Sequence, residues 1–314
     1  MVSLPRPLAL AGFALGVAFA LPLAAADQPA SGSSVDDQDA VSLRGIFDFQ
    51  LPKILWPKSL RFTLNPLFGD LAHKDSVRIR TGVRYAFTRH FEASAEVLPY
   101  LDNFGGEGGG AGIAEYRLGT KFAWHTLLSP YVDTAMGATI VLPAPGAPEE
   151  LSLGTTRFNP YLVFSRDWTP FHGFTTFLNL GYEVFDHDPK PGLIADYRPA
   201  RDNLSITPGV VLHRAPWHYT FATSLRTTAP AGESHEYLSV LPSVSYEIPP
   251  KLMLRLPGRL VVGAGYEAIF FGDDTEHRVT TRIRWDIDWR KAARDLGDNV
   301  RNHLSWNRTS QPTP

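Results

Sequence analysis

Residues 77–87 read VRIRTGVRYAF, and this stretch indicates the fold class of the whole chain. Its odd positions are Val, Ile, Thr, Val, Tyr and Phe, whereas its even positions are Arg, Arg, Gly, Arg and Ala. A helix would scatter these charges around its surface, but a strand places alternate residues on opposite faces. Residues 279–289 (VTTRIRWDIDW) repeat the pattern. The period of two predicts strands with one apolar and one polar face.

The same alternation extends over twelve segments of the chain. Most are 10–13 residues long, whereas strands of globular proteins average about 5–6 residues. A tilted strand needs roughly 9–11 residues to cross a bilayer, which matches these segments better. The predicted strands are 60–68, 76–87, 91–101, 113–124, 130–142, 156–168, 173–185, 203–213, 218–228, 236–248, 259–271 and 278–289.

The connections between these segments alternate in length. The short ones are 88–90, 125–129, 169–172 and 214–217, with a Pro-rich connection at 249–258. The longer ones are 69–75, 102–112, 143–155, 186–202, 229–235 and 272–277. Short turns on one side and longer loops on the other are typical of transmembrane barrels, in which the short turns face the periplasm. An even number of strands then places both termini on the periplasmic side.

Aromatic residues support a membrane boundary, whereas prolines conflict with an uninterrupted ladder. Trp124, Trp168, Trp217 and Trp289 all fall at short-turn ends of predicted strands, where membrane-interface aromatics are expected. Proline removes a donor from the ladder, so each proline inside a strand should lie near a strand end or at a bulge. These prolines are Pro66, Pro99, Pro160, Pro208 and Pro242.

The N-terminal region reads as a targeting signal. Residues 1–26 combine Arg6, an apolar run from Leu8 to Leu23 and a small-residue cleavage site at Ala24–Ala26, as a secretory signal peptide does. An N-terminal anchor helix is the alternative. Residues 27–58 are predicted to be a disordered leader with a possible short periplasmic segment, because 27–42 are polar and acidic. The barrel is predicted at 59–289, and 290–314 are predicted to be a periplasmic tail, possibly a short helix.

The composition excludes several function classes. The net charge of −2 argues against a nucleic-acid-binding protein, because such proteins usually carry a basic excess. The absence of cysteine excludes disulfides, thiolate metal sites and cysteine nucleophiles.

On this alternation of strands and loops over 60–289, the chain resembles bacterial outer-membrane β-barrel proteins, in particular porin-like barrels of about twelve strands. The resemblance rests on pattern and loop length rather than on a short motif. It implies an all-β fold, a single antiparallel up-and-down transmembrane barrel in the bacterial outer membrane. Its implied partners are outer-membrane lipid, the outer-membrane assembly machinery and small polar solutes. One departure is that such barrels commonly end in an aromatic residue, whereas 25 residues follow Trp289 here.

If the apolar faces contact lipid, the opposite faces line the barrel interior. Seven arginines fall on the first, second and last predicted strands, which barrel closure makes neighbours. The predicted pore-lining cations are Arg61, Arg78, Arg80, Arg84, Arg117, Lys121, Arg278, Arg282 and Arg284; Arg226 also faces inward. The predicted pore-lining acids are Glu92, Glu96, Glu115, Asp133, Glu183, Glu247 and Glu267, with Asp286 and Asp288 also inward.

This distribution leads to a hypothesis and an alternative. The hypothesis is a basic wall that faces a more acidic wall across a narrow lumen and favours anionic solutes near the arginines. The alternative is that the charges pair and plug the barrel, because a charge in a tight lumen needs a partner or water. Small inward residues such as Gly137 and Gly209 fit either open space or close packing of a long neighbour.

Catalytic and metal sites find little support in the sequence. The glycine run 105–110 lacks the Lys and Ser/Thr that a phosphate loop requires. The acidic stretch 273–276 lacks EF-hand spacing, so a solvated loop is preferred to a cation site. An outer-membrane hydrolase would need Ser and His within hydrogen-bond reach, for example His213 with Ser205 or Ser224. We predict no enzyme, no cofactor and no metal.

The sequence therefore predicts an outer-membrane channel for passive or facilitated diffusion of small polar, possibly anionic, solutes. The alternatives are a plugged structural or adhesive barrel that acts through its external loops, an outer-membrane hydrolase, and a soluble periplasmic barrel. Residues 43–59 add either a strand or a plug.

Overall fold

The computed structural model describes residues 51–55, 57–68, 76–102, 110–147, 154–168, 173–186, 202–228, 236–253, 257–271 and 274–288. All structural statements concern these residues. The predicted signal peptide, residues 27–50 of the predicted leader, Trp289 and the predicted C-terminal tail lie outside them.

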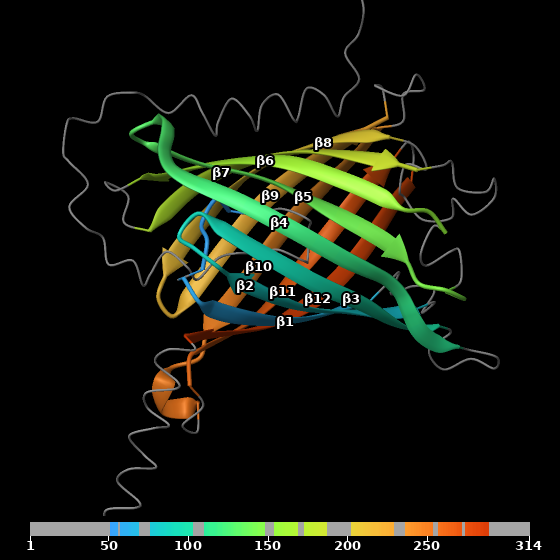
Figure 1. Ribbon diagram of the computed structural model, residues 1–314, viewed down its shortest axis with the longest axis horizontal. Coiled ribbons are helices and arrows are strands. Elements are labelled where there is room, and N and C mark those ends of the chain that lie inside the picture. Colours follow the sequence, from blue (N-terminus) through green and yellow to red (C-terminus); the bar gives the residue numbers. More distant parts are fainter. Residues whose placement is uncertain are drawn as a thin grey trace, which may run out of the picture.

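Twelve antiparallel strands close into one barrel (Figure 1), which confirms the predicted fold and strand number. The strands are β1 (Ser59–Phe68), β2 (Ser76–Ala86), β3 (Phe91–Asp102), β4 (Ala111–Ser129), β5 (Val132–Pro143), β6 (Arg157–Trp168), β7 (Phe174–Phe185), β8 (Asn203–Arg214), β9 (Trp217–Thr227), β10 (Glu236–Glu247), β11 (Arg259–Phe271) and β12 (Asp274–Asp288). One 3-10 turn, Pro250–Leu252, lies between β10 and β11.

The barrel closes by pairing of β1 with β12, and the register is continuous from Ser59↔Asp288 to Phe68↔Val279. The start of β1 and the end of β12 therefore lie at the same end of the barrel. This end also carries the tight turns at 130–131 and 215–216, and we call it the short-turn end. The opposite end, with most of the longer connections, is called the loop end. Which end faces the periplasm stays a prediction.

Two strands are longer than predicted. β4 continues to Ser129 because it pairs with β5 beyond an irregularity after Trp124, so residues 125–129 belong to a protruding hairpin. β12 begins at Asp274 because Asp274 and Thr275 pair with Phe271 and Phe270. The predicted loop 272–277 is therefore wrong, since most of it is strand.

The prolines only partly follow the expectation. Pro99 lies at a register shift between β3 and β4, as predicted. Pro66 lies two residues before the end of β1 and Pro160 three residues after the start of β6, as predicted. Pro208 and Pro242 lie in the middle of β8 and β10 without a bulge, and the prediction for these two is wrong. At each of these four prolines, pairing with one neighbouring strand pauses and resumes in the same register. By strand alternation all five occupy outward positions, so the barrel tolerates a missing donor without a bulge.

The outer face of the strands is apolar and almost uncharged. Large hydrophobic side chains are exposed along it, including Phe62, Leu118, Leu162, Phe221 and Ile283. Among the described strand residues, the Lys, Arg, Asp, Glu and His side chains at outward positions occur only near strand ends. These are Arg166 and Arg214 near the short-turn end and Glu236 and His277 near the loop end. An uncharged belt between two polar rims is the surface that a bilayer requires.

No helix in the described part of the chain has the length and hydropathy needed to cross a membrane.

Candidate functional site

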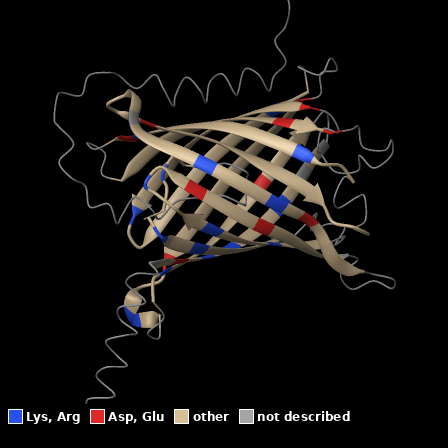
Figure 2. Cartoon of the chain, in the orientation of Figure 1, with Lys and Arg blue, Asp and Glu red and all other residues tan. Residues whose placement is uncertain are grey.

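Most charged strand residues occupy inward positions of the barrel, and many of them are buried. Figure 2 shows where they lie along the strands. Strand alternation turns these side chains inward because their neighbours in sequence form the apolar outer face. The fully or nearly buried charged residues are Arg61, Arg78, Arg84, Glu92, Glu115, Arg117, Lys121, Arg157, Arg282 and Arg284. All except Arg157 were predicted to line the lumen.

One group of charges lies at the seam where the barrel closes. Arg61 is the register partner of both Arg84 on β2 and Asp286 on β12. Its guanidinium contacts the Asp286 carboxylate through two nitrogens, one pair at 2.9 Å, and Arg284 Nε lies 3.2 Å from the same carboxylate. A single carboxylate thus serves two arginines.

Glu92 on β3 continues this group. Its Oε1 lies 2.9 Å from Arg84 Nη1 and 3.0 Å from Lys121 Nζ. Glu92 is 1% exposed and Lys121 is 0% exposed, so these ion pairs are shielded from solvent. Shielded pairs hold their geometry because water does not compete for the charged groups.

A second group lies toward the loop end, where β6 and β8 begin. Arg157 contacts Glu115 and donates from Nη1 to Glu183 Oε1 at 3.3 Å. Glu115 also accepts from Arg117 Nη2 at 2.9 Å, and Glu183 accepts from Asn203 at 3.1 Å. Five residues from β4, β6, β7 and β8 therefore form one continuous network.

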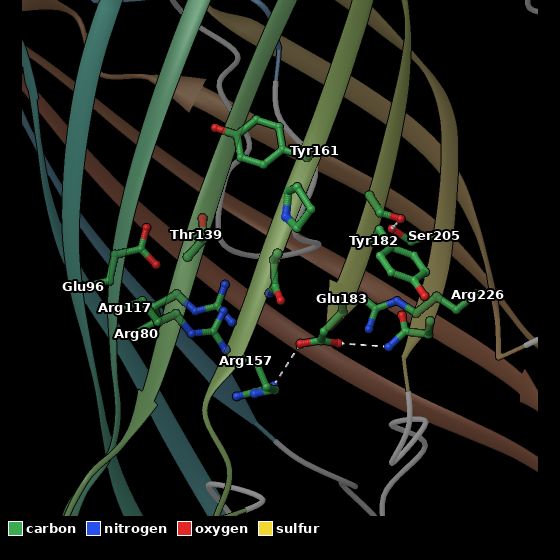
Figure 3. A pocket seen from close by; sticks show the side chains of 14 residues that line it. Arg80, Glu96, Arg117, Thr139, Arg157, Tyr161, Tyr182, Glu183, Ser205 and Arg226 are labelled. Atoms are coloured by element: carbon green, nitrogen blue, oxygen red, sulfur yellow. Dashed lines mark hydrogen bonds and ion pairs between the residues drawn. The ribbon is translucent and has the colours of Figure 1, made fainter. Parts of the chain in front are cut away.

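A cavity of about 100 Å³ opens beside this second group (Figure 3). Four arginines and two acids line it, together with neutral polar side chains such as Thr139, Asn159 and Ser205. The charged lining residues are Arg80, Glu96, Arg117, Arg157, Glu183 and Arg226. Guanidinium groups present several donors in a fixed plane, so this lining suits a carboxylate or phosphate group.

The inner face of β7 to β10 differs from the seam, because most of its central residues are neutral and polar. Thr207 donates to Ser224 at 2.8 Å, and Ser205 donates to the carbonyl of Gly181 at 3.3 Å. We call this surface the hydroxyl wall; its residues are Thr175, Asn179, Ser205, Thr207, Thr220, Ser224, Ser239, Ser243 and Ser245. Glu92 and Glu115, two acids expected on the more acidic wall, pair with Arg84, Lys121, Arg117 and Arg157, and the described central residues of the inner face of β7 to β10 include no acid.

Residues 51–55 lie inside the barrel near its short-turn end. Lys121 Nζ donates to the carbonyls of Leu51 and Lys53, at 3.3 and 2.6 Å. Lys53 Nζ forms a 2.8 Å ion pair with Asp167 on β6. Leu51 and Leu55 are buried, and Ile54 packs against Ala123, Ala135 and Val163. This part of the predicted leader is therefore an ordered segment that lies against the inner face of β3 to β6, and we call it the strap.

The short-turn end also carries a chain of polar contacts around the inner rim. Asp167 accepts from Thr175 at 2.6 Å, and Thr175 Oγ1 lies 3.4 Å from His213 Nε2. His213 Nδ1 lies 3.2 Å from His218 Nδ1, and Arg259 Nη2 donates to Glu247. These contacts tie the strap to the barrel wall through Asp167.

Inward glycines make room for aromatic rings rather than for an open channel. A Cβ on Gly137 would meet the Tyr161 hydroxyl, and a Cβ on Gly209 would meet the Phe177 ring. Tyr161 also donates to the carbonyl of Thr120 at 3.0 Å. The sequence left open space and close packing as alternatives for the small inward residues. Close packing describes Gly137 and Gly209.

Some predicted residues lie apart from the central groups. Asp133 contacts the exposed His125 on the protruding β4–β5 hairpin, at 3.1 Å. Glu267 and Arg278 are register partners near the loop end. Glu247 lies at the inner short-turn rim with Arg259.

Three of the four tryptophans predicted to lie at the membrane interface are described, and they lie at the short-turn end. Trp168 ends β6, where its ring is 4.0 Å from the Arg166 guanidinium carbon and its Nε1 donates to Thr176. Trp217 begins β9 with its ring 4.7 Å from Tyr246. Trp124 lies level with the β2–β3 turn, where the amide of Ala123 donates to the His90 carbonyl.

The sequence reasoning missed Arg157, Arg259 and Lys53. The alternation of Phe158, Leu162 and Phe164 would have placed Arg157 on the inner face of β6. Lys53 gave no such signal, because the segment around it has no strand period.

The structure does not bring the hydrolase candidates together. His213 contacts Thr175 and His218, whereas Ser224 contacts Thr207 and Ser205 contacts Gly181. Ser205 lies eight residues from His213 along β8, roughly 27 Å at the rise of a strand. In the described residues, no group of three or more His, Asp or Glu side chains could hold a metal ion.

Closure of twelve long strands around a polar interior, with an uncharged outer belt, is the architecture of an outer-membrane β-barrel. Structures of similar fold are outer-membrane channels. The KdgM porin shares 9% identity over 72% of this chain and 98% of its own, with a TM-score of 0.44. The NanC porin shares 14% identity over 72% and 97%, with a TM-score of 0.45.

An outer membrane channel from Pseudomonas putida F1 shares 9% identity over 75% of this chain and 97% of its own, with a TM-score of 0.47. At these identities the likeness concerns the barrel fold alone. No protein-family model and no curated protein sequence matches the chain.

Proposed function

We propose that this protein is an outer-membrane channel for passive diffusion of small polar solutes, with a preference for anions. The observation that carries the proposal is the concentration of buried arginines on one side of the lumen, opposite the neutral hydroxyl wall. Its partners are the bilayer, the barrel-assembly machinery and the solute, and it needs no catalytic step. In this proposal the predicted pore-lining residues, apart from Asp133 on the β4–β5 hairpin, form the inner surface of the channel.

The preference for anions follows from the charges on the inner surface. Arginine side chains in a lumen whose protein wall has a low dielectric constant raise the local concentration of anions and repel cations. Several binding sites of moderate affinity in series allow a solute to enter and to leave, as conduction requires. The cavity beside Arg80, Arg117 and Arg157 would be the first such site from the loop end.

The hydroxyl wall complements the arginines for solutes that carry hydroxyl groups. Serine and threonine hydroxyls both donate and accept hydrogen bonds, so they replace the water lost by a polar solute. An anion that also carries hydroxyl groups would contact both surfaces at once.

A plugged barrel is the second candidate, and residues 51–55 specifically favour it. The strap narrows the short-turn end and is held by Lys121, Glu92 and Asp167. In a plugged barrel the strap would block conduction, and the external loops would make the functional contacts. In a channel the strap would set the narrowest cross-section.

Single-channel recording in planar bilayers separates these candidates. We expect stepwise conductance for the wild type, reduced anion selectivity for Arg80→Ala and unchanged selectivity for the outward-facing Arg214→Gln. Absence of stepwise conductance in the wild type and in Arg80→Ala alike contradicts the channel.

Lys121→Met tests the role of the strap, because it removes both contacts to the carbonyls of residues 51 and 53. Conductance scales with the open cross-section, so loosening the strap should raise it by about two-fold or more. The matched control is Lys251→Met, which alters an exposed lysine in the 3-10 turn. A wild type that is silent and a Lys121→Met variant that conducts would favour the plugged barrel.

A further inference from the structure

Arg282 in the middle of β12 is a buried cation with unusual surroundings. It is 4% exposed, and its register partners are Gly263 on β11 and, by continuation of the pairing, Asn65 on β1. Within the described part of the chain, its Nε and Nη2 have no hydrogen-bond partner. No ion pair joins Arg282 to a described carboxylate, in contrast to Arg61 or Arg84.

The nearest charges make this position strongly positive. Arg282 lies within electrostatic reach of Arg284, Arg61 and Arg84, and of the Asp286 carboxylate. Asp286 already contacts Arg61 and Arg284, whereas Glu92 contacts Arg84 and Lys121. Arg282 therefore forms no ion pair with either carboxylate, while three other guanidinium groups lie within its electrostatic reach.

A buried excess of positive charge is unfavourable unless an anion or water compensates it. Removing a guanidinium from water costs several kcal/mol, and repulsion among neighbouring cations adds to this cost. Asn65, 3% exposed, adds a second orphaned group to the same patch, because its Oδ1 has no hydrogen-bond partner among the described residues. Orphaned donors and an orphaned acceptor in one patch indicate a ligand with both acceptor and donor groups.

We propose that Arg282, with Arg61, Arg84, Arg284 and the amide of Asn65, forms a binding site for a small oxyanion in the middle of the lumen. The ligand class is a carboxylate or phosphate group that also carries a hydroxyl. The oxyanion oxygens accept from the free Arg282 nitrogens, and the hydroxyl donates to Asn65 Oδ1. The site deepens the proposed function, on which it rests for the route by which the anion arrives.

If this site exists, replacing Arg282 should not lower the stability of the fold, which is unusual for a buried arginine. A structural arginine stabilises the fold and its removal destabilises it, but removal of an uncompensated buried cation relieves repulsion. We therefore expect Arg282→Gln, in buffer without phosphate, to have a urea midpoint at or above that of the wild type. Added inorganic phosphate stabilises the wild type through binding to the folded state, so its midpoint rises with phosphate concentration.

The experiment measures urea unfolding of the full chain, refolded in detergent micelles, with and without inorganic phosphate at constant ionic strength. We expect a phosphate-dependent shift in the wild type and in the outward control Arg214→Gln, and an apparent phosphate affinity about ten-fold weaker in Arg282→Gln. If Arg282→Gln fails to fold, Arg282→Lys, which keeps the charge but loses the planar donors, should bind phosphate more weakly than the wild type.

Three results would overturn the site: no phosphate shift in the wild type, an equal shift in Arg282→Gln, or a clear loss of stability in Arg282→Gln without phosphate. The readout does not depend on conduction. A phosphate shift lost in Arg282→Gln, in a barrel that never conducts, would keep the site and reject the channel.

Discussion

The seam and the hydroxyl wall are both polar surfaces inside the same barrel, but they meet the cost of burial in different ways. At the seam, Arg61, Arg84 and Arg284 share the carboxylates of Glu92 and Asp286. On the hydroxyl wall, Thr207 and Ser224 satisfy each other. A charge needs a counter-charge from another strand, whereas a hydroxyl needs only a nearby oxygen or amide. The seam, where Arg282 has nitrogens without a described hydrogen-bond partner, is therefore the surface that can still bind a ligand.

The charge on the inner surface differs between the two sides of the lumen. Cations concentrate where β12, β1 and β2 meet, and neutral groups concentrate across β7 to β10. In the proposed channel, such a distribution would set up a transverse field that orients a polar solute with its anionic group toward the seam. The field requires only an uncharged opposite wall, and the acidic wall predicted from the sequence is unnecessary.

The largest difference between the two surfaces should appear when a seam carboxylate is neutralised. Glu92→Gln leaves Arg84 and Lys121 buried without their shared carboxylate, which should cost about 3–5 kcal/mol of unfolding free energy. Urea titration followed by tryptophan fluorescence measures this loss. A loss as small as that of a hydroxyl deletion would contradict the account of the seam.

An intermediate effect is expected where the lumen is filled by packing. A Cβ on Gly137 would clash with the backbone oxygen of Thr120 and with the Tyr161 hydroxyl. Gly137→Ala should therefore cost about 1–3 kcal/mol, through displacement of Tyr161 and strain in β4. Gly110→Ala is the matched control, because a Cβ there has nothing within 4 Å. Equal stability of the two variants would show that Tyr161 does not pack as described.

The smallest effect is expected on the hydroxyl wall. Ser224→Ala removes one hydrogen bond to Thr207 and leaves the Thr207 hydroxyl free to find another acceptor. We expect a loss of about 1 kcal/mol, measured by the same urea titration. A loss comparable to that of Glu92→Gln would mean that the hydroxyl wall is as tightly coupled as the seam.

The sequence predicted the strands well because the alternation that places Val83 outside and Arg84 inside is local information. It failed where strand pairing overrides local composition. The first residue of β12, Asp274, is polar, but it pairs with Phe271 of β11 and so belongs to the strand. The sequence left open whether residues 43–59 add a strand or a plug, and the contacts of Lys53 were not predicted because the segment around it has no strand period. The inward face of Arg282 was predictable, but its lack of a partner was not, because partners depend on register between strands distant in sequence.

The central claim is that the buried arginines make the lumen a conduit for anions. The most direct test is the reversal potential of the wild-type protein in a planar bilayer across a potassium chloride gradient. The account predicts open-channel current carried mainly by chloride, with selectivity reduced by Arg80→Ala and unchanged by Arg214→Gln. Current carried mainly by potassium would contradict it.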